Sequence, residues 1–341
     1  MEQISVFRKD LPLKWMLQIL LKLALFAGLS LLLYYQLLDG WKRMPVDGDL
    51  NFLQRGFSFH QTIFLILAIV LMPLNWTFEA LKWRILMPKD AKISFSKTVK
   101  AVLAGITFSL FTPNRIGEYG GRVLFVNPEN RVQTVFATIK GSIAQWLAIL
   151  SGGLVGILLI ICSNLNTPLV DLSIYLLGFT LIIFSFMLIL YFRMSQIIKL
   201  FLKIPFLKSL AKKLQEKDAT DISIAVLNKT LVLALLRYLA YSLQYFFILE
   251  AFDVNNEIVP CLSAISIVYL LQTGLPVPPT FGLLARGSIA VWIFGMLGDV
   301  DFYLQSNILA ATFSLWFINL FIPALLGTYF IAARIGKSRR V

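Results

Sequence analysis

Long stretches without a charged side chain dominate this chain of 341 residues. Asp, Glu, Lys and Arg are absent from the runs 23–38, 56–78, 141–170, 172–192, 258–285 and 302–333. A seventh run, 230–249, is interrupted only by Arg237. About 20 apolar residues cross a bilayer as a helix, and a hydrocarbon interior permits only helices or closed barrels. The pattern predicts an all-α polytopic membrane protein with about six full spans.

Composition excludes the main alternatives. Apolar residues make up 58% of the chain and charged residues 14%, against roughly 25% charged residues in an ordinary soluble domain. A single soluble core stops growing near this length, so it could not bury that much apolar surface. A soluble enzyme, a disordered chain and a disulfide scaffold are therefore excluded. We expect residues 1–341 to form a single membrane domain.

The N-terminal segment resembles a signal peptide, because Arg8, Lys9 and Lys14 precede an apolar stretch that reaches residue 38. The apolar part is too long for such a peptide, and no small-residue cleavage site follows it. We predict an uncleaved first span.

Lys and Arg residues are distributed unevenly between the connecting segments, which predicts the orientation. Three segments rich in Lys and Arg are 82–100, 193–221 and the tail from 334. Three segments with acidic residues but no Lys or Arg are 163–171, 250–257 and 299–301. The asymmetry predicts a multi-pass protein of the cytoplasmic (inner) membrane with both termini in the cytoplasm. The loop 39–60 is an exception, with three basic and three acidic residues.

The net charge of +13 follows from this topology, so we expect no nucleic-acid partner. Segment 193–221 is predicted to be a basic cytoplasmic linker, or an amphipathic helix on the inner leaflet, because apolar side chains separate its basic residues.

Residues 98–126 lie between two segments that we place in the cytoplasm, 82–100 and the stretch from Arg131 to Lys140. They must therefore enter and leave the membrane on the same side. Pro113 and Gly117 interrupt the helical pattern there. We predict a re-entrant or broken helical hairpin.

The second half contains a similar break, with Pro278, Pro279 and Gly282 between segments that we place outside. Both breaks contain Pro, three residues and Gly, at an offset of 165 residues. We therefore predict an inverted-topology repeat with halves at about 56–162 and 224–333. Such folds place the substrate site near the midplane, where broken helices meet.

Charged side chains at membrane depth predict a functional site. They are Glu79, Arg115, Glu118, Arg122, Arg237 and Arg286. Two polar stripes accompany them at helical spacing, one of Arg237, Tyr241 and Gln244 and one of Asn75, Glu79 and Lys82. The structural alternative is that these arginines snorkel or pair with acids to hold helices together. The same structural alternative is our expectation for Lys22, Lys82 and Arg84, which lie near span ends.

Four arginines against two glutamates leave an excess of positive charge, and the planar guanidinium suits phosphate. We expect Arg115, Arg122, Arg237 and Arg286 to bind membrane lipids with an anionic head group, and Glu79 or Glu118 to carry protons. The sequence predicts neither protein partners nor a homo-oligomeric state.

Metal and cofactor sites are not expected. Cys162, Cys261 and His60 are too few and too scattered for the three or four ligands of a zinc or iron site. No nucleophile motif stands out, so we do not expect an enzyme.

The residues Pro113, Arg115, Gly117 and Glu118 form a Pro-x-Arg-x-Gly-Glu motif. This motif resembles that of the flippase-like membrane domain of lysyl-phosphatidylglycerol synthases and of stand-alone membrane proteins related to it. The similarity extends over roughly 12–335.

The second motif of that family is Pro-rich and normally continues to a glutamate. Here Pro278, Pro279 and Gly282 match it, whereas the glutamate is missing and Arg286 stands nearby. The resemblance implies movement of a lipid between leaflets. It does not imply lysyl transfer by this membrane domain, because the soluble aminoacyl-transferase domain has no counterpart here.

Two other functions stay open. A non-transporting membrane scaffold or assembly partner is one, although a scaffold gains nothing from four buried arginines. A polyprenyl-phosphate-dependent glycosyltransferase is the other, because Asp47 with Asp49 and Asp299 with Asp301 could form acidic pairs in outer loops. Asp-Gly sequences such as Asp47-Gly48 also favour simple turns.

Overall fold

The computed structural model describes residues 57–88, 91–110, 112, 115–163, 167–201, 222–254, 257–273, 282–298 and 301–338. The predicted first span, Pro113, Pro278, Pro279 and most of the predicted basic linker lie outside these ranges. All regular structure within them is helical. The helices are α2 (Phe59–Leu86), α3 (Phe95–Ser109), α4 (Gly117–Val123), η4 (Pro128–Asn130), α5 (Arg131–Ile161), α6 (Pro168–Phe192), α7 (Met194–Phe201), α9 (Ile224–Ala251), α10 (Ile258–Thr273), α11 (Gly282–Gly295), α12 (Phe302–Trp316), η5 (Phe317–Phe321) and α13 (Ile322–Ser338).

Five helical stretches in the described residues are long and apolar enough to cross a membrane. They are α2, α5 with η4, α6, α9, and the continuous stretch from α12 into α13. Each coincides with a predicted span. The chain is therefore a multi-pass membrane protein by the length and composition of its helices.

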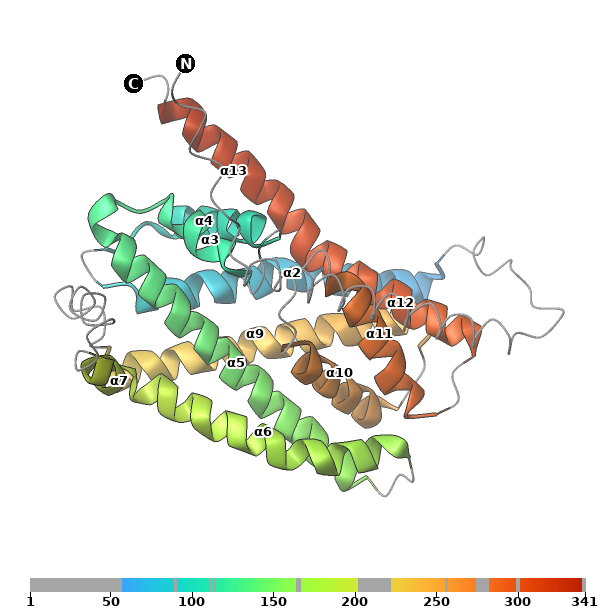
Figure 1. Ribbon diagram of the computed structural model, residues 1–341. Coiled ribbons are helices and arrows are strands. Elements are labelled where there is room, and N and C mark those ends of the chain that lie inside the picture. Colours follow the sequence, from blue (N-terminus) through green and yellow to red (C-terminus); the bar gives the residue numbers. More distant parts are fainter. Residues whose placement is uncertain are drawn as a thin grey trace, which may run out of the picture.

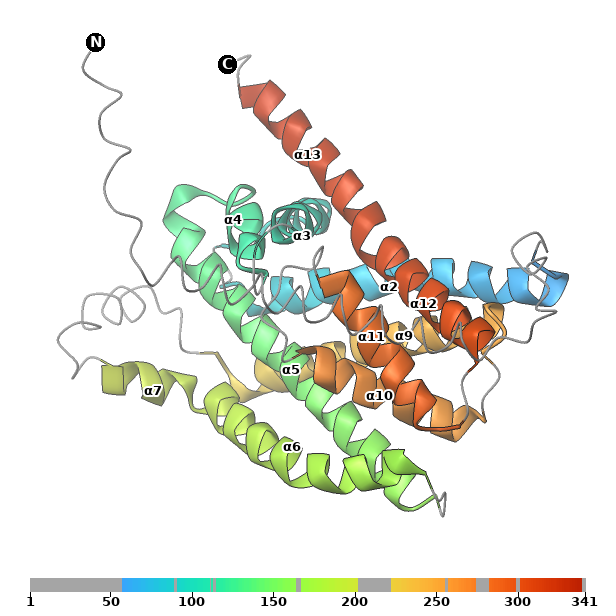
Figure 2. The same cartoon turned by 45° about the vertical axis from the view of Figure 1, so that its right-hand side comes forward.

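Helices α2 and α9 lie side by side through the middle of the bundle and run in opposite directions (Figures 1 and 2). Both have 28 residues, and their first residues are 165 positions apart. Each begins at a serine N-cap: the Ser58 side chain accepts a hydrogen bond from the amide of Gln61, and that of Ser223 from the amide of Val226.

The two ends of the bundle carry opposite charges. At the basic end lie Arg84, Arg131, Arg193 and Lys229, near the end of α2, the start of α5, the end of α6 and the start of α9. At the acidic end lie Asp171, Glu250, Asp253 and Asp301.

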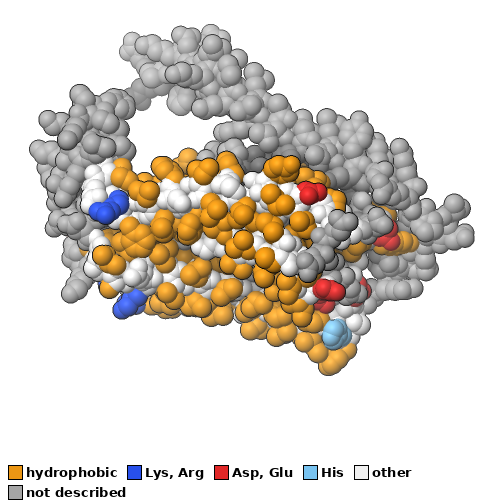
Figure 3. All heavy atoms as spheres, turned by 90° about the horizontal axis from the view of Figure 1, so that it is seen from below, with side chains coloured by type: hydrophobic (Ala, Val, Ile, Leu, Met, Phe, Trp, Pro, Cys, Tyr) orange, Lys and Arg blue, Asp and Glu red, His pale blue; other side chains and the backbone are white. Residues whose placement is uncertain are grey.

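Between these ends the surface is apolar, as Figure 3 shows for one face. Helix α6 packs mainly on α5, and Tyr175, Phe179, Ile182 and Phe186 on it are largely exposed. An apolar belt with charges only at its ends suits the hydrocarbon core of a bilayer.

Two pairs of shorter helices interrupt this arrangement. The α3–α4 pair follows the end of α2 and leads into the start of α5, so it leaves and returns to the basic end. The α10–α11 pair follows α9 and leads into α12, so it leaves and returns to the acidic end.

Glycine allows the first pair to pack closely. A Cβ atom on Gly121 of α4 would lie 2.5 Å from the carbonyl oxygen of Ala104 and 2.6 Å from the Cα of Gly105, both on α3. Thr112 connects the two helices, because its hydroxyl accepts a hydrogen bond from the amide of Gly117 (2.8 Å) and donates to Phe108 in the last turn of α3 (3.2 Å).

A π-helical turn, η5, joins α12 to α13. Pro323 follows it, and proline lacks an N–H and clashes with the carbonyl of the residue four positions earlier, Asn319. The wider π-helical turn accommodates the missing backbone hydrogen bond and the proline ring. The side chain of Asn319 lies in the bundle interior.

One stretch differs from the prediction. Residues 131–140, which we expected to be a cytoplasmic connection, form the first turns of α5. Lys140 is buried, and its ammonium donates to the carbonyl oxygen of Tyr191 at the end of α6. An unpaired carbonyl of the last helical turn thereby receives a charged donor.

Candidate functional site

The most strongly charged part of the interior surrounds Glu79 on α2. Its carboxylate lies 2.6 Å from the Lys82 ammonium, 2.7 Å from the Arg122 guanidinium and 2.8 Å from that of Arg237. Arg122 also contacts Glu118. We call these five residues, Glu79, Lys82, Glu118, Arg122 and Arg237, the Glu79 network.

Three helices supply the network. Glu79 and Lys82 lie one turn apart on α2, Glu118 and Arg122 one turn apart on α4, and Arg237 lies near the middle of α9. The close approach of α4 to α3 at Gly121 positions the neighbouring Arg122 inside the bundle. The network therefore connects a short broken-helix element to the two central spans.

Aromatic and amide side chains surround these charges. The guanidinium of Arg122 lies over the ring of Trp83 and that of Arg237 over the ring of Trp76, with centroid distances of 5.4 and 5.0 Å. Such stacking stabilises desolvated cations.

Three amides complete the hydrogen bonding. Asn75 accepts from Arg237 (3.0 Å) and donates to Asn319 (2.9 Å), whereas the side-chain oxygen of Gln145 accepts from Arg237 and Lys82 (3.2 Å each).

Arg115 lies at the edge of the network. Its Nε is 3.6 Å from a carboxylate oxygen of Glu118, and its side chain is 38% exposed. Its φ is 58°, in the left-handed region that arginine rarely adopts, so this residue forms the sharp point of the break before α4. With Arg115, four cations face two carboxylates, which leaves an excess of two positive charges.

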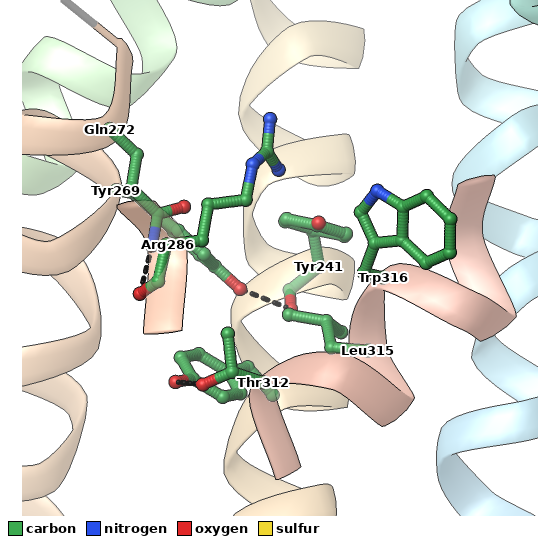
Figure 4. Close-up of a pocket in the computed structure, with 8 residues that line it drawn as sticks. Tyr241, Tyr269, Gln272, Arg286, Thr312, Leu315 and Trp316 are labelled. Atoms are coloured by element: carbon green, nitrogen blue, oxygen red, sulfur yellow. Dashed lines mark hydrogen bonds between the residues drawn. The ribbon is translucent and has the colours of Figure 1, made fainter. Parts of the chain in front are cut away.

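Arg286 lies elsewhere, in a pocket at the α9, α10, α11 and α12 contact (Figure 4). The enclosed space in the pocket is small, about 10 Å³. Its lining consists of Tyr241, Tyr245, Tyr269, Gln272, Arg286, Thr312, Leu315 and Trp316. We call it the Arg286 pocket.

The predicted site residues thus fall into three groups. The structure brings Glu79, Arg115, Glu118, Arg122 and Arg237 together. Tyr241 and Arg286 line the separate pocket. Gln244 joins neither group, because its amide donates to the carbonyl oxygen of Ala68 on α2 (2.7 Å) and so connects the two central helices. Among the predicted break residues, Gly117 begins α4 and Gly282 begins α11.

Lys82 pairs with an acid, as the structural alternative for a cation near a span end allows, because it is buried against Glu79. Helix α2 continues to Leu86, so Lys82 lies in the bundle interior. The stripe of Asn75, Glu79 and Lys82 was the signal for this. Gln145 and Asn319 were missed because neither is charged, although Asn319 precedes a helix-disturbing proline.

No group of three or more His, Cys, Asp or Glu side chains in the described part of the chain could hold a metal ion.

Comparison with known families then identifies the domain. The family model of the lysylphosphatidylglycerol synthase TM region matches residues 19–327. The chain belongs to this family. Comparison with curated proteins and with solved structures gave no match. The family is one of membrane domains with a lipid-related role, and its model covers both the Glu79 network and the Arg286 pocket.

Proposed function

We propose that this protein moves a lipid with an anionic head group between the two leaflets of the cytoplasmic membrane. The observation that carries this proposal is the excess of cations in the Glu79 network and at its edge, where Arg115 lies. Arg237 lies 13 residues into α9, about 20 Å along the helix from its basic end. Uncompensated cations at such depth are costly, and an anionic head group would compensate them.

In this proposal the halves 56–162 and 224–333 form an inverted-topology repeat. The equal lengths and serine caps of α2 and α9, their opposite directions and their offset of 165 residues support it. The α3–α4 and α10–α11 pairs would be re-entrant hairpins from opposite sides, and the basic end would face the cytoplasm together with both termini.

The residues of the Glu79 network have complementary roles in this proposal. Arg237 and Arg115 are the cations of the group that retain partial exposure, 14% and 38% of their side chains, so they would meet the head group first. Glu79 would form ion pairs with Arg122 and Arg237 between transport events. These arginines would exchange that carboxylate for the lipid phosphate when the lipid binds. Glu79 or Glu118 could take up a proton while the phosphate is bound.

The test is leaflet-to-leaflet movement of labelled phosphatidylglycerol in proteoliposomes. We expect movement by the unmodified protein, and loss of most of that movement in Arg115→Ala and Arg237→Ala. The control is Arg193→Ala at the exposed basic end, which we expect to be active. Folded protein that moves neither phosphatidylglycerol, cardiolipin nor undecaprenyl phosphate would overturn the proposal and favour the scaffold function.

A further inference from the structure

The polar groups of the Arg286 pocket divide into two sets. The first set is satisfied within the protein. Tyr245 and Thr312 share a hydrogen bond between their hydroxyls (2.6 Å), and the hydroxyl of Tyr269 donates to the backbone carbonyl of Tyr241 (3.1 Å). These bonds fix the positions of the aromatic rings, and the rings of Tyr241 and Tyr269 stack at 5.1 Å.

The second set includes a donor that no acceptor in the described residues satisfies. The indole N–H of Trp316 is buried without a hydrogen-bond partner. The side chains of Tyr241 and Arg286 line the same pocket as this indole. In Figure 4 the Arg286 guanidinium and the Trp316 indole nitrogen point away from Thr312, and Tyr241 lies between these two side chains in this view.

The charge of this pocket is also uncompensated. Among the described residues Arg286 forms no ion pair with any carboxylate. Buried donors and charges without partners are costly, so natural interiors satisfy them. A buried indole N–H without a partner beside a guanidinium without a carboxylate indicates a missing acceptor with negative charge.

We propose that the Arg286 pocket is a phosphate-binding subsite, in which the Arg286 guanidinium, the Trp316 indole N–H and the Tyr241 hydroxyl donate to phosphate oxygens. Several donors around one tetrahedral anion match the acceptor capacity of phosphate. Tyr241 lies four residues beyond Arg237 on α9, about 6 Å along the helix. The subsite is therefore one helical turn from the Glu79 network, toward the acidic end. The identification of the phosphate as that of a lipid rests on the proposed function.

The test is a binding measurement on the purified full-length protein in detergent. Titration with dihexanoyl phosphatidylglycerol, with inorganic phosphate and with uncharged dihexanoylglycerol compares the two phosphate sources with a ligand that lacks phosphate. We expect Arg286→Gln to weaken phosphate-dependent binding at least about tenfold, as the loss of a charge-assisted hydrogen bond does. Tyr241→Phe and Trp316→Phe each remove one donor and little volume, and we expect about threefold weaker binding for each. Arg193→Gln is the control with unchanged affinity.

A lipid that binds much more tightly than inorganic phosphate identifies the head group as the ligand, and equal affinities identify free phosphate. The proposal is overturned if Arg286→Gln binds both phosphate ligands within twofold of the unmodified protein. Its failure is separable from that of the proposed function. Transport of phosphatidylglycerol with affinity insensitive to Arg286 would refute the subsite alone. Phosphate binding that depends on Arg286, without any transport, would refute the transport function alone.

Discussion

The Glu79 network and the Arg286 pocket both place arginine inside the bundle, but they treat its charge differently. In the network Arg122 and Arg237 each contact a carboxylate, and each stacks on a tryptophan. In the pocket, Arg286 forms no ion pair with a carboxylate among the described residues. The first arrangement holds three helices together, whereas the second keeps its donors available.

Because of this difference, we expect substitutions in the two regions to affect different properties of the protein. Removal of a group from the network breaks bonds that the folded protein already contains, so it should lower stability. Removal of Arg286 takes away a cation without a partner, so it should affect ligand binding and leave stability almost unchanged.

The largest effect is expected for Glu79→Gln. This change leaves Lys82, Arg122 and Arg237 without their shared counter-charge, and removal of one member of a buried ion pair costs about 3–5 kcal/mol. Thermal unfolding in detergent, followed in a Cys162→Ser background by the reaction of a thiol dye with buried Cys261, measures the loss. Glu257→Gln, at the exposed acidic end, is the control. An unchanged Tm for Glu79→Gln would contradict the claim that the ion pairs of Glu79 stabilise the fold.

The next effect concerns the glycine contact that positions Arg122. Gly121→Ala would force a Cβ atom to within 2.5 Å of the α3 backbone, which cannot move as a flexible side chain could. We expect a loss of about 3 kcal/mol, at the upper end for an overpacked interior. Gly120→Ala is a matched control on the same helix, because no atom lies within 4 Å of its added Cβ. The same unfolding assay compares the two, and equal stabilities would contradict the close packing of α3 and α4.

The comparison of the two arginine environments is tested by one pair of variants. Arg122→Gln removes a partner from both Glu79 and Glu118, and we expect a loss of about 2 kcal/mol because Glu79 keeps Lys82 and Arg237. Arg286→Gln should leave the Tm in the same assay unchanged or slightly raised. A larger loss of stability for Arg286→Gln than for Arg122→Gln would contradict the distinction between a stabilising network and a ligand-binding pocket.

The smallest effect is expected for the amide pair between α2 and η5. Asn319→Ala removes the hydrogen bond to Asn75 but leaves the bond from Arg237 to Asn75 intact. Hydrogen bonds between membrane helices average about 0.6 kcal/mol, so the Tm should fall only slightly. A loss comparable to that of Glu79→Gln would mean that the network depends on Asn319 more than its geometry indicates.

Much of this architecture was predictable because a bilayer restricts the possible structures. The apolar runs located all five spans in the described residues, and charge at membrane depth identified Glu79, Arg122 and Arg237 before any contact was known. The offset of 165 residues between the two breaks also separates α2 from α9 and α4 from α11.

The division between network and pocket was not predictable. Arg237, Tyr241 and Gln244 share a helical stripe, yet Arg237 and Gln244 contact α2, whereas Tyr241 between them lines the pocket. Side chains one turn apart point to different neighbours when helices cross at an angle, and the sequence does not contain that angle. The burial of Lys82 was not predictable for a related reason, because it depends on how far α2 continues beyond the apolar run.

The most direct test of the account combines function and stability in one variant, Arg286→Gln. Equal amounts of folded unmodified and variant protein are reconstituted, and the rate at which labelled phosphatidylglycerol crosses the bilayer is measured at several lipid fractions. The account predicts a transport rate that rises with protein density, and an Arg286→Gln variant of unchanged Tm that needs at least about tenfold more lipid to reach half its maximal rate. A rate equal to that of protein-free vesicles for the unmodified protein, or identical lipid dependence for both proteins, would contradict it.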